Sequence, residues 1–140
     1  MNYLLDTNVI SELIKKAPNA NVIRWIENHH ESSLFLSVIT FGELQKGISK
    51  LSDEIKADQL RTWVYEALTK RFEYRILTLD LDVMSTWGRL VGSSEKKGVK
   101  LPVLDSLIAA TAMVHNLYVV TRNVSDFEHC QVSVENPWVK

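Results

Sequence analysis

The chain alternates short apolar segments with longer segments whose apolar residues recur at helical spacing. The segments YLL (3–5), SLFLSVI (33–39), YRILTL (74–79) and LYVVTRN (117–123) are typical of strands, and VSV (132–134) predicts a further short one. Strands that are apolar throughout are buried on both faces, and parallel strands need crossover connections, which are usually helices. The pattern therefore predicts an α/β fold with a central parallel β-sheet flanked by helices.

The helical segments carry recognisable start and stop signals. Apolar spacing predicts helices over 8–16, from Pro18 onward, over 40–51, 53–72, 82–97 and 102–116. Thr40 and Glu43 have the spacing of a capping box, and Gly98 is a stop signal for the helix before it. No linker or repeat divides the chain, so residues 1–140 are expected to form one domain.

Charge and cysteine content exclude several classes of protein. The net charge of −1 gives no overall basic field, so any nucleic-acid binding must use local patches. The single cysteine, Cys130, excludes an internal disulfide and a cysteine-based zinc cluster. No apolar run is long enough to span a membrane and no secretory signal is visible, so a cytoplasmic location is expected.

Four acidic residues occupy comparable positions relative to the predicted strands. Asp6 ends the first strand, Glu43 and Asp105 lie near the starts of helices, and Asp126 follows the strand at 117–122, close to Asn123. Ligand sites of parallel sheets lie at the carboxyl ends of the strands, so these groups are expected to converge. Clustered carboxylates repel one another, and a divalent cation such as Mg²⁺ or Mn²⁺ relieves that repulsion. The acids therefore predict a metal site able to act on a phosphodiester.

Each acid except Asp6 also has a structural interpretation. Glu43 fits the return half of a capping box, Asp105 fits the favourable charge of a helix's first turn, and Asp126 fits a turn. Asp80 and Asp82 also follow a strand, but one of them is expected to cap the next helix, with no metal role.

Other polar residues carry weaker signals. The four histidines lack metal-ligand spacing, and no glycine-rich phosphate loop is present. Several basic residues are candidates for phosphate contacts, although a solvated charged face explains most of them equally well: Lys46, Lys50, Arg89, Lys96, Lys97, Lys100 and Arg122.

The segments LLDTNVISEL (4–13), SVITFGELQKGI (37–48), LPVLDSLIAATAMVHNLYVVTRNVSDF (101–127) and ENPW (135–138) together resemble the PIN-domain family. Within it they resemble the VapC-like toxins of type II toxin–antitoxin systems, most closely the FitB branch. The resemblance implies a three-layer α/β sandwich with a Mg²⁺ or Mn²⁺ site. It also implies an endoribonuclease that cleaves single-stranded RNA, with transfer RNA among the candidate substrates, and that a cognate antitoxin neutralises.

Carried over by position, the resemblance assigns catalytic and metal-binding roles to Asp6, Glu43 and Asp105. The fourth group lies in TRNVSDF, where many members have an acid directly after TR and this chain has Asn123. Either Asn123, through its amide oxygen, or Asp126 is expected to complete the site. A further set is expected to hydrogen-bond the carboxylates or metal-bound waters: Thr7, Asn8 and Thr121.

The resemblance also implies partners. It implies a homodimer, larger assemblies with antitoxin, and operator DNA bound only through the antitoxin, with no membrane association. Trp25 and Trp63 are candidates for the apolar surface that such contacts need, and they are equally consistent with core residues.

Two other functions fit parts of the pattern. A PIN-like domain without catalysis, which only binds antitoxin or RNA, is supported by the uncharged Asn123. A receiver-type signalling domain also has acids at strand ends, but it needs adjacent acids after the first strand and a lysine after a late one, which this chain lacks.

Overall fold

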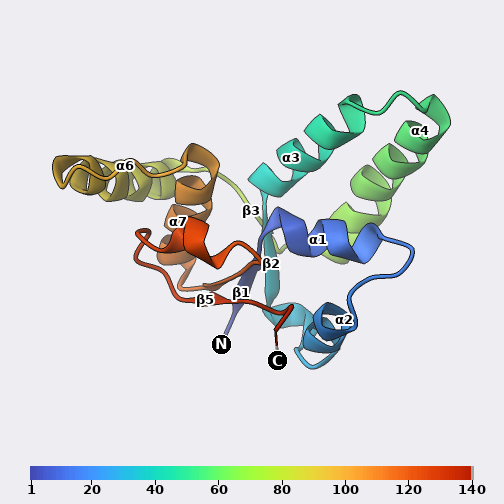
Figure 1. The fold of residues 1–140 in the computed structure, drawn as a ribbon, viewed down its shortest axis with the longest axis horizontal. Coiled ribbons are helices and arrows are strands. Elements are labelled where there is room, and N and C mark those ends of the chain that lie inside the picture. The colour runs from blue at the N-terminus through green and yellow to red at the C-terminus, as the bar shows by residue number, and fades with distance from the viewer. Residues whose placement is uncertain (140) are drawn as a thin grey trace.

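The computed structural model describes residues 1–139, and its centre is a five-stranded parallel sheet (Figure 1). The strands are β1 (Tyr3–Leu5), β2 (Leu34–Ser37), β3 (Ile76–Leu77), β4 (Tyr118–Val120) and β5 (Val134–Glu135), in the order β3-β2-β1-β4-β5. Leu4 of the middle strand pairs with Phe35 on one side and Val119 on the other. Every pairing is parallel, as the apolar strands predict.

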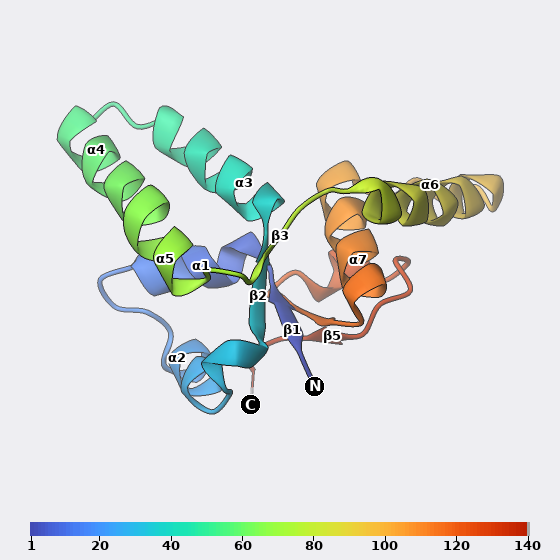
Figure 2. The ribbon, with the colours of Figure 1, turned by 180° about the vertical axis from the view of Figure 1, so that it is seen from behind.

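Helices connect the strands and cover both faces of the sheet (Figures 1 and 2). They are α1 (Thr7–Ile14), α2 (Ala20–Glu27), α3 (Val38–Ser49), α4 (Glu54–Thr62), α5 (Thr69–Arg71), α6 (Leu81–Lys96) and α7 (Val103–His115). Short 3₁₀ helices occupy Glu31–Ser33 and Val124–Phe127. The predicted three-layer α/β sandwich is therefore confirmed.

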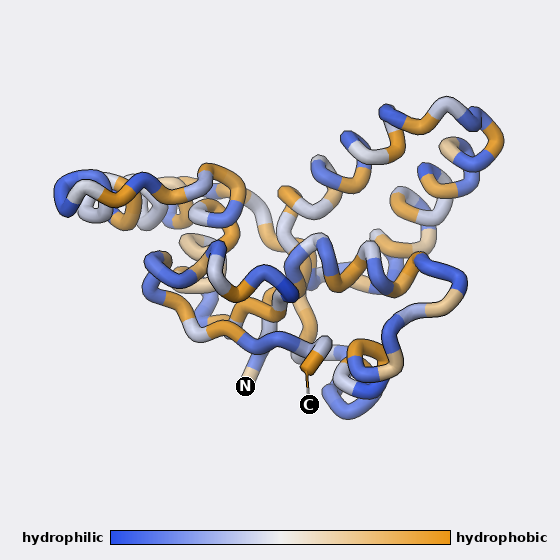
Figure 3. Tube along the Cα trace, viewed as in Figure 1, coloured by the Kyte–Doolittle hydropathy of each residue, from blue (hydrophilic) through white to orange (hydrophobic). Residues whose placement is uncertain are grey.

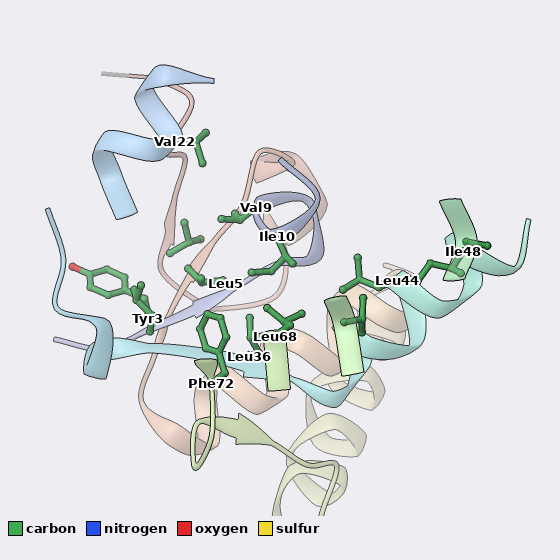
Figure 4. Packing of buried hydrophobic residues seen from close by; sticks show 14 residues of the cluster. Tyr3, Leu5, Val9, Ile10, Val22, Leu36, Leu44, Ile48, Leu68 and Phe72 are labelled. Carbon is green, nitrogen blue, oxygen red and sulfur yellow. The ribbon is translucent and has the colours of Figure 1, made fainter. Parts of the chain in front are cut away.

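Alternate residues of each strand enter two separate cores, which explains why the strands show no polar alternation. Tyr3 and Leu5 pack with Val9, Leu36 and Phe72 in the first core (Figure 4), on the side of α1 to α5. In the second core, formed mainly with α6 and α7, the buried residues include Leu4, Ile108 and Val119. The two sets of side chains point to opposite faces because successive side chains of a strand alternate.

Strand β1 lies where the chain changes direction across the sheet. The connection after β1 leads to β2 and then β3 on one side, whereas β4 and β5 lie on the other. Crevices at the carboxyl ends of strands form at such switch points. Asp6, directly after β1, is therefore at the position where an open sheet of this kind binds its ligand.

The predicted capping box at Thr40 and Glu43 is wrong. Helix α3 begins earlier, at Val38, and its N-cap is Ser37, whose Oγ accepts a hydrogen bond from the Ile39 N–H at 3.1 Å. Thr40 is completely buried inside the helix. The strand predicted over 33–39 ends at Ser37, because this serine caps the helix that begins at the next residue.

Other boundaries differ by a few residues. Helix α2 starts at Ala20 with Asn19 as its cap, not at Pro18, and the last strand lies at Val134–Glu135. The stop signal at Gly98 is confirmed: this residue follows α6 with φ of 81°, a conformation that glycine adopts readily.

The long helix predicted over 53–72 is present, but it is not α-helical throughout. A π-helix occupies Trp63–Leu68 between α4 and α5. In Figure 3 hydrophobic and hydrophilic residues alternate along α3 and α4, as expected for helices with one buried face. Among residues 1–139, no helix is long and apolar enough to cross a membrane.

The two tryptophans that were candidates for a contact surface have different surroundings. Trp25 is half-buried, with its ring edge-on to Tyr3 and stacked on His29 at 3.9 Å between ring centroids. It therefore belongs to the periphery of the first core. Trp63 also packs against that core, but it lines an apolar groove between α1, α3 and α4.

The cap at Ser37 gives a stability prediction. Ser37→Ala should lower the free energy of unfolding by about 1–2 kcal/mol, because the buried Ile39 N–H loses its acceptor. Urea unfolding followed by circular dichroism measures this. Ser49→Ala, at the exposed end of the same helix, should change it by less than about 0.5 kcal/mol. Equal effects of the two substitutions would contradict the assignment of the cap.

Candidate active site

Three of the four predicted acids line one open pocket at the carboxyl edge of the sheet. Asp6 comes from the end of β1, Glu43 from α3 and Asp105 from the first turn of α7. The pocket has a volume of about 360 Å³, and Asn123, just after β4, also lines it. Residues separated by up to 117 positions in sequence therefore meet because their strands are neighbours.

Asp6 is held by a network of hydrogen bonds from the start of α1 and from the end of β4. Its side chain is only 6% exposed, with Oδ1 accepting from the Thr7 N–H at 2.8 Å and Oδ2 from the Thr121 hydroxyl at 2.8 Å. The Asn8 amide donates to the same Oδ2 at 3.5 Å and to the Thr121 oxygen at 3.1 Å. Burial raises the pKa of Asp6, although the bonds from Thr121 and Thr7 oppose that shift.

Glu43 is oriented by the first helix and not by its own. The Thr7 hydroxyl donates to Glu43 Oε1 at 2.6 Å and lies 3.1 Å from the Thr40 hydroxyl. Glu43 lies in the second turn of α3, where no free backbone N–H needs a cap. Thr7 thus follows Asp6 in sequence and joins it to Glu43 in space.

Asp105 is partly buried and lies near the other acids. Burial, followed by the charges of Asp6, Asp126 and Glu43, raises the pKa of its carboxyl to about 6. A carboxylate of ordinary surroundings titrates near 4. No cation of the protein compensates the group, since among residues 1–139 no ion pair includes Asp105.

Asn123 and Asp126 occupy different places. Asn123 lines the pocket, and its backbone N–H donates to the Thr121 hydroxyl oxygen at 3.0 Å. Asp126 is exposed, lies outside the pocket lining in the 3₁₀ helix after Asn123, and acts on Asp6 and Asp105 through its charge. Between the two residues, it is Asn123 that faces the pocket.

The acids form an open cluster and not a closed cage. Within the described chain, no three acidic, histidine or cysteine side chains lie close enough to enclose a metal ion. Asp80 and Asp82 stay outside the pocket; Asp80 caps α6 by accepting from the Val83 N–H at 2.9 Å, as expected. Strand β3 is at the edge of the sheet, two strands from β1, which keeps these acids apart from the others.

One wall of the pocket is formed by residues that were not predicted from the sequence. Ser11, Glu12 and Lys15 line it from α1, and Trp138 lines it from the C-terminal segment. Helical spacing is the signal that would have found the first three, since they continue the face that begins with Thr7 and Asn8. No local pattern would have placed Trp138 there.

The chain is similar to proteins of a known family over most of its length. A family model described as the PIN domain matches residues 3–130. Toxin FitB of Neisseria gonorrhoeae is 35% identical over 135 residues, which cover 96% of this chain and 97% of that protein. VapC ribonuclease Y4jK of Sinorhizobium fredii is 33% identical over 135 residues, which cover 96% of each chain.

Solved structures agree over nearly the whole length. The crystal structure of FitAcB from Neisseria gonorrhoeae matches with a TM-score of 0.91 at 34% identity, covering 99% of each chain. A structure of FitAB bound to an IR36 DNA fragment matches with a TM-score of 0.90 at 33% identity, covering 99% of this chain and 96% of that one. The chain therefore belongs to the PIN-domain family, among relatives that are named VapC ribonucleases and FitB toxins.

Proposed function

We propose that this protein is a metal-dependent endoribonuclease toxin of a type II toxin–antitoxin system, acting on single-stranded RNA through one PIN domain that spans residues 1–140. The observation that carries the proposal is the convergence of Asp6, Glu43 and Asp105 on one pocket, in a chain similar to a VapC ribonuclease and a FitB toxin. Membership of the PIN-domain family leaves the receiver-type alternative without support.

The residues at the pocket fit a divalent cation. Carboxylate and amide oxygens are the ligands that Mg²⁺ and Mn²⁺ prefer, and burial together with the neighbouring acids raises the pKa of Asp105. Asp6 and Asp105 would bind Mg²⁺, or Mn²⁺ in its place, with Glu43 and Asn123 completing the set, and Asp126, outside the pocket lining, would add its negative charge. The bound ion would lower the pKa of a water molecule and stabilise charge on the scissile phosphate.

The surrounding polar residues set the direction of the acids. Thr121, Thr7 and Asn8 donate to the carboxylate of Asp6 and hold it in one orientation. The Thr7 hydroxyl donates to Glu43 Oε1, and among residues 1–139 no group donates a hydrogen bond to Oε2. Glu43 is therefore placed to accept a proton from the attacking water.

A groove beside the pocket fits the antitoxin that this function requires. The groove is about 800 Å³ in volume, apolar residues of α1, α3 and α4 line it, and it shares Thr7, Ser11, Lys15 and Glu43 with the acidic pocket. An apolar helical segment seated there would reach the acids directly. The proposal includes a homodimer, larger assemblies with the antitoxin, and operator DNA bound through the antitoxin, in line with the solved structure of FitAB bound to an IR36 DNA fragment.

A PIN-like domain that has lost catalysis is the second candidate, because Asn123 contributes no charge to the pocket. The two candidates differ in metal binding, since an inactive scaffold has no reason to keep a high affinity for Mn²⁺.

Cleavage gives the first test of the proposal. Asp6→Asn should lower the rate of RNA cleavage at least about a hundredfold, because it removes a metal ligand while keeping the shape of the buried side chain. EDTA should abolish cleavage by the unsubstituted protein. Asp82→Asn, which changes charge equally outside the pocket, should retain activity in the same gel assay. Full activity of Asp6→Asn, or cleavage in EDTA, would overturn the proposal.

The raised pKa of Asp105 gives a prediction for the stability of the folded protein. In metal-free buffer near neutral pH, Asp105→Asn should raise the free energy of unfolding by about 1–2 kcal/mol, a value discounted for the solvent that screens this pocket. Between about pH 4 and pH 6 the folded protein binds the extra proton, so unfolding free energy falls as pH rises through this window. The gain from Asn should therefore vanish near pH 4, and urea titrations at several pH values measure it. A gain of equal size from Asp82→Asn would contradict this origin.

Metal affinity should follow the ionisation of Asp105. Protons compete with the metal below a pKa of about 6, so Mn²⁺ affinity measured by calorimetry should fall about fourfold or more between about pH 7.5 and about pH 5.5. Affinity that is high and independent of pH in this range would contradict a role for Asp105 as a ligand. The absence of Mn²⁺ binding at about pH 7.5 would instead favour the inactive scaffold.

A further inference from the structure

The acidic pocket continues along one face of α1. Thr7, Asn8, Ser11, Glu12 and Lys15 all line it, at the spacing of a single helix face. Asp6 caps the start of this helix and Lys15 its end. At about 1.5 Å per residue, the two lie about 13 Å apart along the axis. One end of the pocket is therefore acidic, and the polar face of α1 leads from it to the Lys15–Glu12 ion pair.

Arg122 joins the same wall from the neighbouring strand. It directly follows Thr121, and its backbone N–H donates to Asn8 Oδ1 at 3.3 Å, which fixes its backbone beside the first turn of α1. Its guanidinium lies over the Trp138 ring at 5.5 Å from the centroid. Among residues 1–139, no ion pair and no side-chain hydrogen bond involves this guanidinium. Its donors are therefore available to a ligand in the pocket.

Trp138, whose ring lies under Arg122, is held through its backbone. Asn136 Oδ1 accepts from the Trp138 backbone N–H at 2.9 Å, and the Asn21 side chain donates to the Trp138 backbone carbonyl at 2.9 Å. The indole also packs against the first core. Stacking of a guanidinium on tryptophan is attractive and biases an otherwise free side chain toward one position.

Lys15 is a weaker cation because it is already paired. Its Nζ lies 2.9 Å from Glu12 Oε1, and Glu12 is only 5% exposed, with its other oxygen accepting from the Asn19 N–H at 2.9 Å. The hydrogen bond from Lys15, and then that from Asn19, lower the pKa of Glu12, which keeps the pair ionised. The pair has no net charge, so Arg122 carries the uncompensated positive charge of this wall.

We propose that Arg122, assisted by Lys15, forms a phosphate-binding subsite for the RNA nucleotides that flank the cleaved bond, with the strand lying along α1. The inference rests on the proposed ribonuclease function and deepens it. Arginine matches phosphate oxygens with paired donors, and its planar group keeps that geometry while stacked on tryptophan. Arg122 does not serve to neutralise the acids, since it pairs with none of them and Asp105 keeps a raised pKa.

The experiment measures binding of a labelled, mixed-sequence, single-stranded RNA oligonucleotide by fluorescence anisotropy over a range of salt concentrations. An Asp105→Asn background prevents cleavage during the titration. Adding Arg122→Gln should weaken binding about tenfold at low salt, the effect of one charge-assisted contact, and should reduce the slope of log affinity against log salt by about 0.7. Lys15→Gln should have a smaller effect, because Lys15 is already paired with Glu12.

Two further variants separate a phosphate contact from a structural role. Arg122→Lys should recover the salt slope, since it restores the charge, but only part of the affinity, since it loses the paired donors. Arg89→Gln removes an exposed arginine of α6 outside the pocket and should change neither quantity. Circular dichroism of each variant checks that the fold is kept.

The inference is overturned if the RNA does not bind to the Asp105→Asn parent, or if Arg122→Gln and Arg89→Gln bind it alike. Cleavage of the same RNA by the unsubstituted protein is measured in parallel. Cleavage together with an unaltered Arg122→Gln titration would refute the subsite alone. Absence of cleavage would count against the proposed function, whereas the binding titration would still decide whether Arg122 holds phosphate.

Discussion

The hydrogen bonds around Asp6 connect the parts of the structure on which the site depends. Asp6 continues the central strand, caps α1 through the Thr7 N–H, and receives the Thr121 hydroxyl from the end of β4. Thr7 then binds Glu43 of α3. Two strands and two helices are thus joined at the point where a parallel sheet opens at its carboxyl edge. This polar network is buried at the top of two apolar cores, so its geometry depends on the packing below it.

The site combines a rigid support with unfavourable electrostatics. Both carboxylate oxygens of Asp6 accept hydrogen bonds. For Asp105, burial and the neighbouring negative charges raise the pKa to about 6. A protein that kept this arrangement for stability alone would place a cation beside Asp105. The arrangement instead suits a pocket whose compensating charge arrives with a ligand. Such a site lowers the stability of the protein, and the packing of the rest of the fold offsets this cost.

Positive charge is kept outside the acidic centre but within the same pocket. Lys15 is fixed by Glu12, and Arg122 is fixed by the Trp138 ring, so neither neutralises the carboxylates. A strand of RNA presents repeated phosphates, so a chain with a net charge of −1 can still bind it through a few placed cations. The apolar groove that meets this pocket at Lys15 and Glu43 would give an antitoxin access to both charged regions.

The sequence by itself determined the parallel sheet, the helices that cover it, and the strand-end position of Asp6, because burial on both faces leaves a continuous apolar pattern. It also marked Asp105 and the motifs of the PIN-domain family. Only the tertiary structure decided the partners: Ser37 and not Thr40 caps α3, Thr7 orients Glu43, and Asn123 rather than Asp126 lines the pocket. The contacts of Thr7 with Glu43 and of Arg122 with Trp138 join separate segments of the chain, whereas the Ser37 cap is a local bond to Ile39 that depends on where the helix begins. Local patterns record which residues are buried, whereas the order of strands in the sheet decides which of them meet.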